Sequence, residues 1–566
     1  MRVFLLLLLV VNLLPGCSNN SGGPDLILTN GKIWTADDEG SFAEAVAIRE
    51  NKILQTGNSA DISRLAGRNT RVVDLHGCLV IPGFNDAHIH FLSGSLGLAR
   101  VDLNDAKTPV DIASKVLAFA KDHPESQWIV GRGWQYTSFE SGMPDAATLH
   151  AIDTVRRPVF LTAYDGHSAW ANHAALKLAG VDSKTAFDGF GTVVVDTRRQ
   201  PTGALLEGAK RLVSKFIPDP TRKENLDAIR LGMKMAARLG LTSVHNANGD
   251  PAELSLYREL LSGNELTIRY RSSFSIGKDA TDAYIDSLVL IRDSLGTGNP
   301  MLRADAIKFM IDGVIESHTG AMLEPYSDVS HGEKGTLSWP ADKYRSRVQQ
   351  LDAKGFHLTV HAIGDGAVRE ALDAYELAAR QNSMRDRRHR IEHIESVSPL
   401  DIPRFKTLGV WASMQPIHAD PGTSAVWERA AGPERTRYGF AWNSLLKEGA
   451  SLVYGSDWPA CINVDPLHGI HIAVNRRTPD GYPEGGYVPE QAISVKEALL
   501  AYTRAGAVSS FEERTKGQIK AGYLADMVVL SQDLFTIPPM DIAKTEVLMT
   551  VFDGRVIFER EPETRN

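Results

Sequence analysis

In the middle of the chain, short apolar runs alternate with longer stretches in which apolar residues recur at helical spacing. This alternation is typical of parallel β–α–β units. Eight of the runs have the length and composition of buried strands: residues 80–86, 242–246, 266–274, 304–311, 356–361, 390–393, 410–414 and 452–456.

The spacing of these runs indicates how the units are arranged. From the second run onward, neighbours begin roughly 20 to 55 residues apart, as β/α units do. The first gap is far longer, so we expect an insertion at about residues 98–205. Eight units predict an α/β fold, a (β/α)8 TIM barrel over residues 81–507. An open doubly wound sheet is the alternative, but the Gly-rich phosphate loop that usually accompanies that fold is not evident.

Both ends of the chain alternate short apolar runs with turns and lack helical spacing. The runs are residues 26–28, 45–48, 52–54, 525–530 and 551–557. Asn30-Gly31 and Asp553-Gly554 are strong hairpin signals, and Glu50-Asn51 separates two further runs in the same way. We therefore expect residues 25–80 and 508–566 to form one β-sandwich domain.

The first residues have the features of an export signal. Arg2 precedes an apolar run over residues 3–14, which is too short to span a bilayer comfortably. The run ends in Gly16-Cys17, as in a bacterial lipobox, which predicts a lipoprotein signal peptide over residues 1–16, lipidation of Cys17 and a tether over 17–24. Ser18 after the cysteine favours the outer membrane, at its periplasmic face in the cell envelope. An ordinary cleaved signal with a chance cysteine is the alternative.

Composition narrows the range of partners. The 566 residues are 43% hydrophobic and 23% charged, with a formal net charge of −8 and no long basic run. Nucleic acid is therefore not an expected partner.

The sequence has two cysteines besides Cys17, namely Cys78 and Cys461, and these are too few for a disulfide framework. We expect both to be packed, free thiols. A small-molecule substrate and a lipid anchor in a membrane are the expected partners, and a homodimer is left open.

Residues with metal and proton chemistry gather where the predicted strands end. His88 and His90 stand at i, i+2 on an extended segment, so both point to one side. The other strand ends contribute Lys308, His361, His393 and Asp457. Each has a structural alternative: Lys308 as a buried neutral or paired lysine, Asp457 as a helix N-cap before Trp458-Pro459. Their coincidence at the rim where barrel active sites lie favours a metal site.

The chain resembles the amidohydrolase superfamily, within it the YtcJ-like branch that includes N-substituted formamide deformylase. The resemblance covers residues 25–560. It is carried by residues 82–90, 308–313, 360–365 and 390–393, by Met414-Gln415-Pro416 with His418, and by residues 455–459 and 522–526. The branch implies a TIM barrel flanked by a composite β-sandwich, and metal-dependent hydrolysis of a C–N bond in an amide-like small molecule.

The resemblance also implies residue roles. His88, His90, His361 and His393 match metal ligands, and Lys308 matches the lysine that forms a carbamate bridging two metals. Asp457 matches the carboxylate that binds metal and transfers the proton. Two zinc ions are expected, with iron or manganese as alternatives and one ion if Lys308 is unmodified. Desolvation of Lys308 in an apolar strand agrees with this role, because it favours the neutral amine that reacts with CO₂.

Four residues are candidates for substrate contact: His167, Trp170, His318 and Gln415. Relatives often carry a basic residue such as arginine near His318, so the chain departs from the pattern there. His167 and Trp170 lie in the insertion and have capping and packing as an alternative role. Two other functions share the same residues. One is hydrolysis of a cyclic amide or ester, and the other is a non-catalytic, lipid-anchored binding protein.

Overall fold

The computed structural model describes residues 23–561, apart from residues 141, 145–147, 149–151, 165–167, 189–190, 297, 330–331 and 462. The predicted signal peptide, Cys17 and nearly all of the tether lie outside this range. No helix in the described part of the chain is long and apolar enough to cross a membrane.

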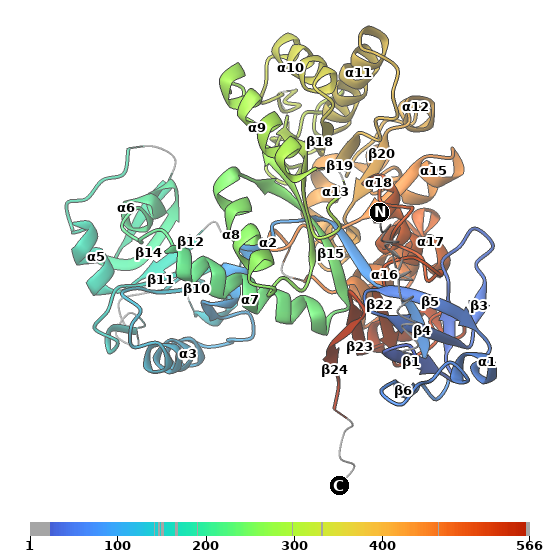
Figure 1. Ribbon diagram of the computed structural model, residues 1–566. Coiled ribbons are helices and arrows are strands. Elements are labelled where there is room, and N and C mark those ends of the chain that lie inside the picture. Colours follow the sequence, from blue (N-terminus) through green and yellow to red (C-terminus); the bar gives the residue numbers. More distant parts are fainter. Residues whose placement is uncertain are drawn as a thin grey trace, which may run out of the picture.

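An eight-stranded parallel sheet forms a nearly closed barrel at the centre of the molecule (Figure 1). Its strands are β8 (Phe84–Ile89), β15 (Leu241–Gly249), β16 (Arg269–Ser275), β17 (Leu302–Met310), β18 (His357–Ala362), β19 (Arg390–His393), β20 (Trp411–Met414) and β21 (Ser451–Tyr454). Each strand pairs with the next in chain order. Beyond the end of β21, the Asp457 amide donates to the His88 carbonyl oxygen at 2.7 Å, which joins the last strand segment to the first. The predicted barrel is confirmed.

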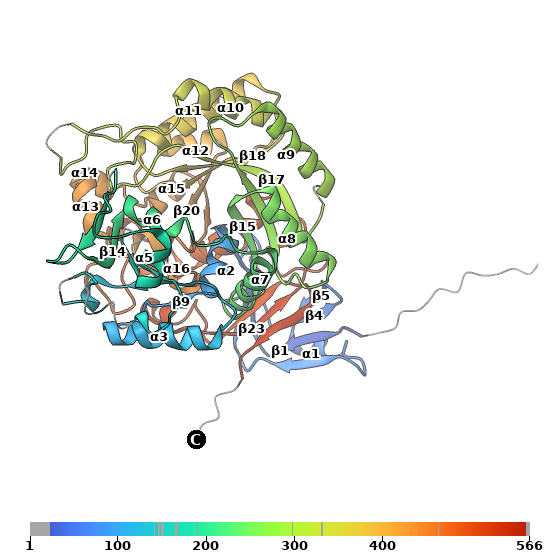
Figure 2. The same ribbon diagram turned by 90° about the vertical axis from the view of Figure 1, so that its left-hand side faces the viewer.

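Helices surround the barrel, and Figure 2 shows several of them curving around the strands. They are α7 (Arg222–Arg238), α8 (Pro251–Ser262), α9 (Asp282–Leu295), α10 (Ala341–Ala353), α11 (Asp365–Gln381), α12 (Ile402–Leu408) and α15 (Trp442–Lys447). Local sequence sets where they begin. Thr221 and Glu224 form a capping box at the start of α7, and Asp250 caps α8 ahead of Pro251.

The first predicted strand, residues 80–86, is wrong as a single element. It divides at Gly83 into β7 (Leu79–Pro82), which belongs to another sheet, and β8 of the barrel. The Gly83 amide donates to the Asp526 carbonyl oxygen at 3.0 Å, and the Phe84 amide donates to Gly240 at 3.0 Å. A Cβ atom at Gly83 would lie 2.2 Å from Thr242 Oγ1, so only glycine allows the chain to pass from one sheet to the other here.

Both chain ends contribute to a β-sandwich at one side of the barrel. One sheet has the order β5-β4-β1-β6 and the other β24-β23-β22-β7-β2-β3. The strands are β1 (Leu26–Thr29), β2 (Lys32–Trp34), β3 (Phe42–Ala43), β4 (Ala45–Arg49), β5 (Lys52–Gly57), β6 (Arg71–Asp74), β22 (Met527–Leu530), β23 (Val547–Phe552) and β24 (Arg555–Glu559). Apolar side chains from both sheets share one core.

Two of the predicted turns join paired strands, and one does not. Glu50-Asn51 connects β4 to β5 and Asp553-Gly554 connects β23 to β24, as expected. The Asn30-Gly31 hairpin is wrong, because β1 and β2 lie in different sheets. A local turn signal does not decide the partner of each strand when two sheets compete for it.

The predicted insertion contains a sheet of its own, with the order β13-β14-β12-β11-β10-β9. Its strands are β9 (Val101–Asp102), β10 (Ile129–Trp134), β11 (Val159–Ala163), β12 (Ser168–Ala171), β13 (Gly191–Val195) and β14 (Pro201–Glu207). Helix α3 (Pro109–Asp122) packs on this sheet and shares a separate apolar core with it. In Figure 1 the insertion stands on the left of the barrel and is connected to it next to α2 (Phe91–Leu98).

Candidate metal centre

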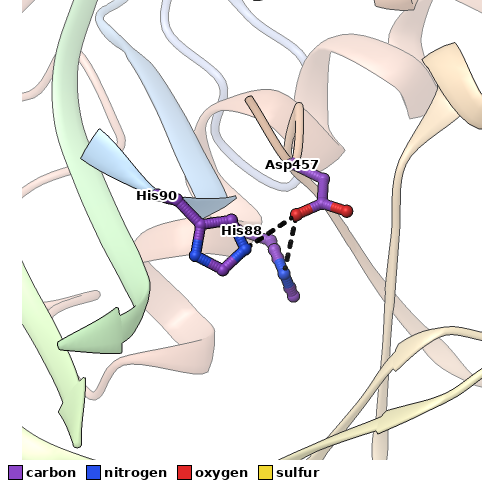
Figure 3. Close-up of side chains that lie close together, drawn as sticks. All are labelled: His88, His90 and Asp457. Carbon is purple, nitrogen blue, oxygen red and sulfur yellow. Dashed lines mark ion pairs between the residues drawn. The ribbon is translucent and has the colours of Figure 1, made fainter. Parts of the chain in front are cut away.

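Asp457 lies at the centre of a cluster of histidines where the barrel strands end. Its Oδ1 atom is 3.3 Å from His88 Nε2 and 3.1 Å from His90 Nε2 (Figure 3). The two histidines reach the same carboxylate oxygen because they are two residues apart at the end of β8. His88, His90 and Asp457 together offer three ligand atoms close enough to hold one metal ion.

A second group of potential ligands shares the same carboxylate. Asp457 Oδ2 is 3.3 Å from His418 Nε2 and 3.9 Å from His393 Nδ1. His418 lies in the short helix η3 (Pro416–Ala419) that follows β20, and its Nε2 atom is buried without a hydrogen bond. These three residues also meet the spacing of a metal site. His418 belongs to the motif that follows the seventh predicted strand, but no role for it was predicted from the sequence.

Oxygen atoms behind three of these histidines hold the rings in place. His88 Nδ1 is 2.6 Å from Glu392 Oε2, His393 Nδ1 is 2.8 Å from Gln415 Oε1, and His418 Nδ1 is 2.9 Å from Glu395 Oε1. In His88 and His418, a proton on Nδ1 that is donated to oxygen leaves the lone pair of Nε2, the nitrogen that faces Asp457, for a metal. This arrangement is common around metal-bound histidines. Gln415, predicted to contact substrate, thus supports His393.

The charge on Glu392 is itself maintained by a buried partner. Burial would raise the pKa of Glu392, but Arg390 and His88 together lower it to about 2. Arg390 Nε donates to Glu392 Oε1 at 2.9 Å, and its Nη2 donates to the Ala87 carbonyl oxygen at 2.9 Å. Glu392 therefore stays ionised at neutral pH and can keep the His88 ring oriented.

Lys308 is next to the first group of ligands. Its Nζ atom is 3.4 Å from His88 Nε2, and the side chain is buried in β17. Burial lowers the pKa of Lys308 to about 8, against the opposing effect of Glu392 and Asp457. The side chain therefore has the lowered proton affinity that its apolar strand predicts.

His361 lies near the cluster but faces another way. Its ring centroid is 4.4 Å from that of His393, whereas its Nε2 atom is 3.2 Å from the Gly313 carbonyl oxygen and 3.6 Å from Asp312 Oδ1. It belongs to neither three-residue group among the described residues. Its predicted role as a ligand thus stays a prediction.

The backbone at the end of β21 brings the carboxylate of Asp457 into place. Asp457 has a φ of 56°, in the left-handed region that few residues other than glycine adopt. Asp86 Oδ1 accepts hydrogen bonds from the amides of His88 and Ser456, both at 3.1 Å, and so ties the first and last strands together. The next regular helix, α16, begins at Pro466, so Asp457 does not cap a helix.

The other substrate candidates differ in their surroundings. His167 lies outside the described residues. Trp170 is fully buried in the core of the insertion, with its ring 5.4 Å from that of Phe139, which agrees with the alternative packing role. His318 borders a cavity of about 560 Å³ beside Asp312, and its Nε2 atom is 2.7 Å from Asp328.

The fold and the ligand groups are those of a metal-dependent hydrolase. The sequence model described as "Amidohydrolase family" matches residues 71–558, and the chain belongs to this family. LONG AFTER FAR-RED 3 of Arabidopsis thaliana is 32% identical, over 94% of this chain and 91% of that protein. N-substituted formamide deformylase of Arthrobacter pascens is 26% identical, over 95% of this chain and 98% of that one, in agreement with the predicted branch.

A solved structure shares the architecture. An uncharacterized metal-dependent hydrolase from Pyrococcus furiosus superposes with a TM-score of 0.71 at 26% sequence identity, covering 91% of this chain and 99% of that one. The barrel, the terminal sheets and the insertion are therefore an arrangement that the chain shares with a relative.

Proposed function

We propose that the chain hydrolyses a C–N bond of an amide-like small molecule. The observation that carries this proposal is the position of Asp457, whose two carboxylate oxygens each face two histidines. A single carboxylate in this position can hold metal and accept a proton in the same site. The name of the deformylase relative supports amide hydrolysis and suggests N-substituted formamides as the first compounds to test.

The donor set fits two divalent ions. Imidazole nitrogens and carboxylate oxygens suit zinc, and also iron or manganese. His88, His90 and Asp457 would hold one ion, and we propose that carboxylated Lys308, His361 and His393 would contribute to the second. Metal ions held by these residues would supply an activated water at neutral pH and would polarise the scissile carbonyl.

The protein residues would complete the reaction by moving one proton. Asp457 accepts the proton released by the attacking water and passes it to the leaving nitrogen. Burial would raise the pKa of Asp457, but His88 and His418 lower it well below its usual range, so the carboxylate starts ionised. No side chain has to form a covalent bond with the substrate in this scheme.

A panel of N-substituted formamides, other linear amides, cyclic amides and esters, assayed with zinc-loaded protein, tests the proposal. We expect linear amides to be cleaved, and the Asp457→Asn variant to lose roughly 10²- to 10⁴-fold in kcat at saturating zinc. Turnover of cyclic amides or esters alone would contradict the reaction class. If nothing is turned over although metal is bound, the non-catalytic alternative is favoured.

A further inference from the structure

A cavity of about 330 Å³ lies directly beside the metal centre, between the barrel and the insertion. We name it the Arg132 cavity; its polar lining consists of His90, Ser93, Arg132, Asn246, Asn248 and Glu253. Its volume is at the low end of the range for small-molecule sites. Because His90 forms part of the wall, a molecule in this cavity would contact the metal centre.

Arg132 brings a positive charge to the cavity. The side chain is exposed on β10 of the insertion, and its Nη2 atom donates to the Tyr164 carbonyl oxygen at 3.1 Å. It makes no ion pair with any residue that the structure describes. The carboxylate of Asp102, opposite Arg132 on β9, is held instead by the Asn104 side chain at 2.7 Å.

Glu253 is the one carboxylate in this lining, and other groups hold it. Its Oε1 atom accepts a hydrogen bond from the Tyr270 hydroxyl at 2.8 Å. Burial raises the pKa of Glu253 to about 7, so much of its charge is lost near neutral pH. Ser93, Asn246 and Asn248 are neutral, so Arg132 supplies the permanent positive charge of this lining.

The cavity beside Asp312 and His318 has a different character. It is lined by His318, Glu333 and Lys334, of both charge signs, and His318 is already paired with Asp328. The Arg132 cavity, by contrast, combines a guanidinium that has no ion-pair partner among the described residues with a wall formed by a candidate metal ligand. A guanidinium presents a planar fork of donors that matches a carboxylate in two parallel hydrogen bonds.

We propose that the substrate is an amide bearing a carboxylate, which Arg132 binds while the amide carbon lies at the metal centre. This inference rests on the proposed amide hydrolysis and adds the substrate class. The insertion would then determine specificity, since it supplies the charged end of the site whereas the barrel supplies the reacting end.

Matched pairs of amides, identical except that a carboxylate is replaced by a carboxamide, test the inference. Zinc-loaded wild type should cleave the carboxylate member with a kcat/KM about 10- to 100-fold higher. Arg132→Gln should remove this preference mainly by raising KM for the carboxylate member, and Arg132→Lys should restore part of it. Arg198→Gln, an exposed arginine of the same insertion outside the cavity, is the control. Equal rates within pairs, or a preference that survives in Arg132→Gln, would overturn the inference.

A binding measurement separates this inference from the proposed reaction. Glutarate has a second carboxylate that pentanoate lacks, and neither compound contains an amide, so calorimetry with zinc-loaded protein compares the two without any turnover. We expect glutarate to bind about tenfold or more tightly to wild type, with the difference lost in Arg132→Gln. If glutarate binds more tightly to wild type but no amide is hydrolysed, the proposed reaction is rejected and the carboxylate-binding role of Arg132 is retained. Equal binding of both probes would overturn the inference even if amides are cleaved.

Discussion

Glu392 and His88 are in contact across the inside of the barrel, with 2.6 Å between Oε2 and Nδ1, although 304 residues separate them. Both side chains are fully buried, and Arg390 keeps the carboxylate charged. The contact fixes which nitrogen of His88 faces Asp457. The metal centre therefore depends on a residue that need not touch a metal.

The first prediction concerns this contact. Glu392→Gln should weaken zinc binding by about 10- to 100-fold, because an amide orients His88 less strongly and makes it less basic. Competition with a chromogenic chelator measures the affinity. Glu376→Gln, on α11, serves as the control because the ion-pair partners of Glu376 among the described residues are Arg380 and Arg404, neither of which belongs to the metal centre. Unchanged zinc affinity in Glu392→Gln would show that metal binding does not require Glu392 to orient His88.

The second prediction concerns the pH at which Lys308 can react with CO₂. The pKa of Lys308 is lowered to about 8, so the neutral amine increases as the pH rises through 8. Between pH 7 and pH 9 the neutral fraction should rise about tenfold. Metal-free protein in ¹³C-bicarbonate should show a carbamate signal by NMR that grows with this profile and is absent in Lys308→Met. A signal that is independent of pH over this range would contradict the pKa.

The same shift has a consequence for stability. The pKa of Lys308 is lower in the folded protein than the ordinary lysine value of 10.5, so the unfolded chain binds its proton more tightly. The contribution of Lys308 to the free energy of unfolding should therefore rise with pH between about 8 and 10.5. Denaturant titrations of metal-free wild type and Lys308→Met should diverge over this window, and parallel pH profiles would count against the buried, neutral lysine.

The third prediction tests the close approach of the first and last strands. A Cβ atom at Gly455 would lie 2.4 Å from the His88 amide nitrogen and 2.8 Å from Asp86 Oδ1. Gly455→Ala should therefore push His88 away from Asp457 and destabilise the fold by about 1–3 kcal/mol, with a measurable loss of zinc affinity. Gly277→Ala, where a Cβ meets open space, is the control. A variant with native zinc affinity would show that this spacing is not required.

The fourth prediction concerns the joint between barrel and sandwich. Arg269 is buried, with Nε 2.6 Å from Asp526 Oδ2 and Nη2 2.9 Å from Asp553 Oδ1. Arg269→Met would leave these carboxylates without their partner, at a cost of about 3–5 kcal/mol in the free energy of unfolding. Urea denaturation measures the change. A loss below about 1 kcal/mol would mean that the two domains are held mainly by other contacts.

The fifth prediction concerns the residues before the described part of the chain. Lipidation of Cys17 should place the protein in the membrane fraction, and Cys17→Ser should move it to the soluble fraction of the envelope. Intact mass of the mature chain gives the second readout, since a diacylated cysteine adds a characteristic mass. A wild-type chain that is soluble and unmodified would favour the ordinary cleaved signal.

The barrel and the positions of the main site residues could be predicted from the sequence because both are local patterns. Apolar runs mark strands, and polar residues of metal chemistry follow them at one rim. Other features depend on the three-dimensional arrangement. The break at Gly83 depends on Thr242, and the role of Glu392 depends on a residue of another strand. His418 lies in a short helix, where no strand periodicity points it toward the site.

An anomalous-scattering map of crystals grown with zinc is the most direct test of the metal centre at His88, His90 and Asp457. We expect a peak within about 2.0–2.2 Å of nitrogen atoms of His88 and His90 and an oxygen of Asp457, and a second peak a few ångströms away. The peaks should disappear in crystals of the His88→Ala/His90→Ala double variant. A map without a peak at these three residues, or full zinc occupancy in the double variant, would contradict the metal centre.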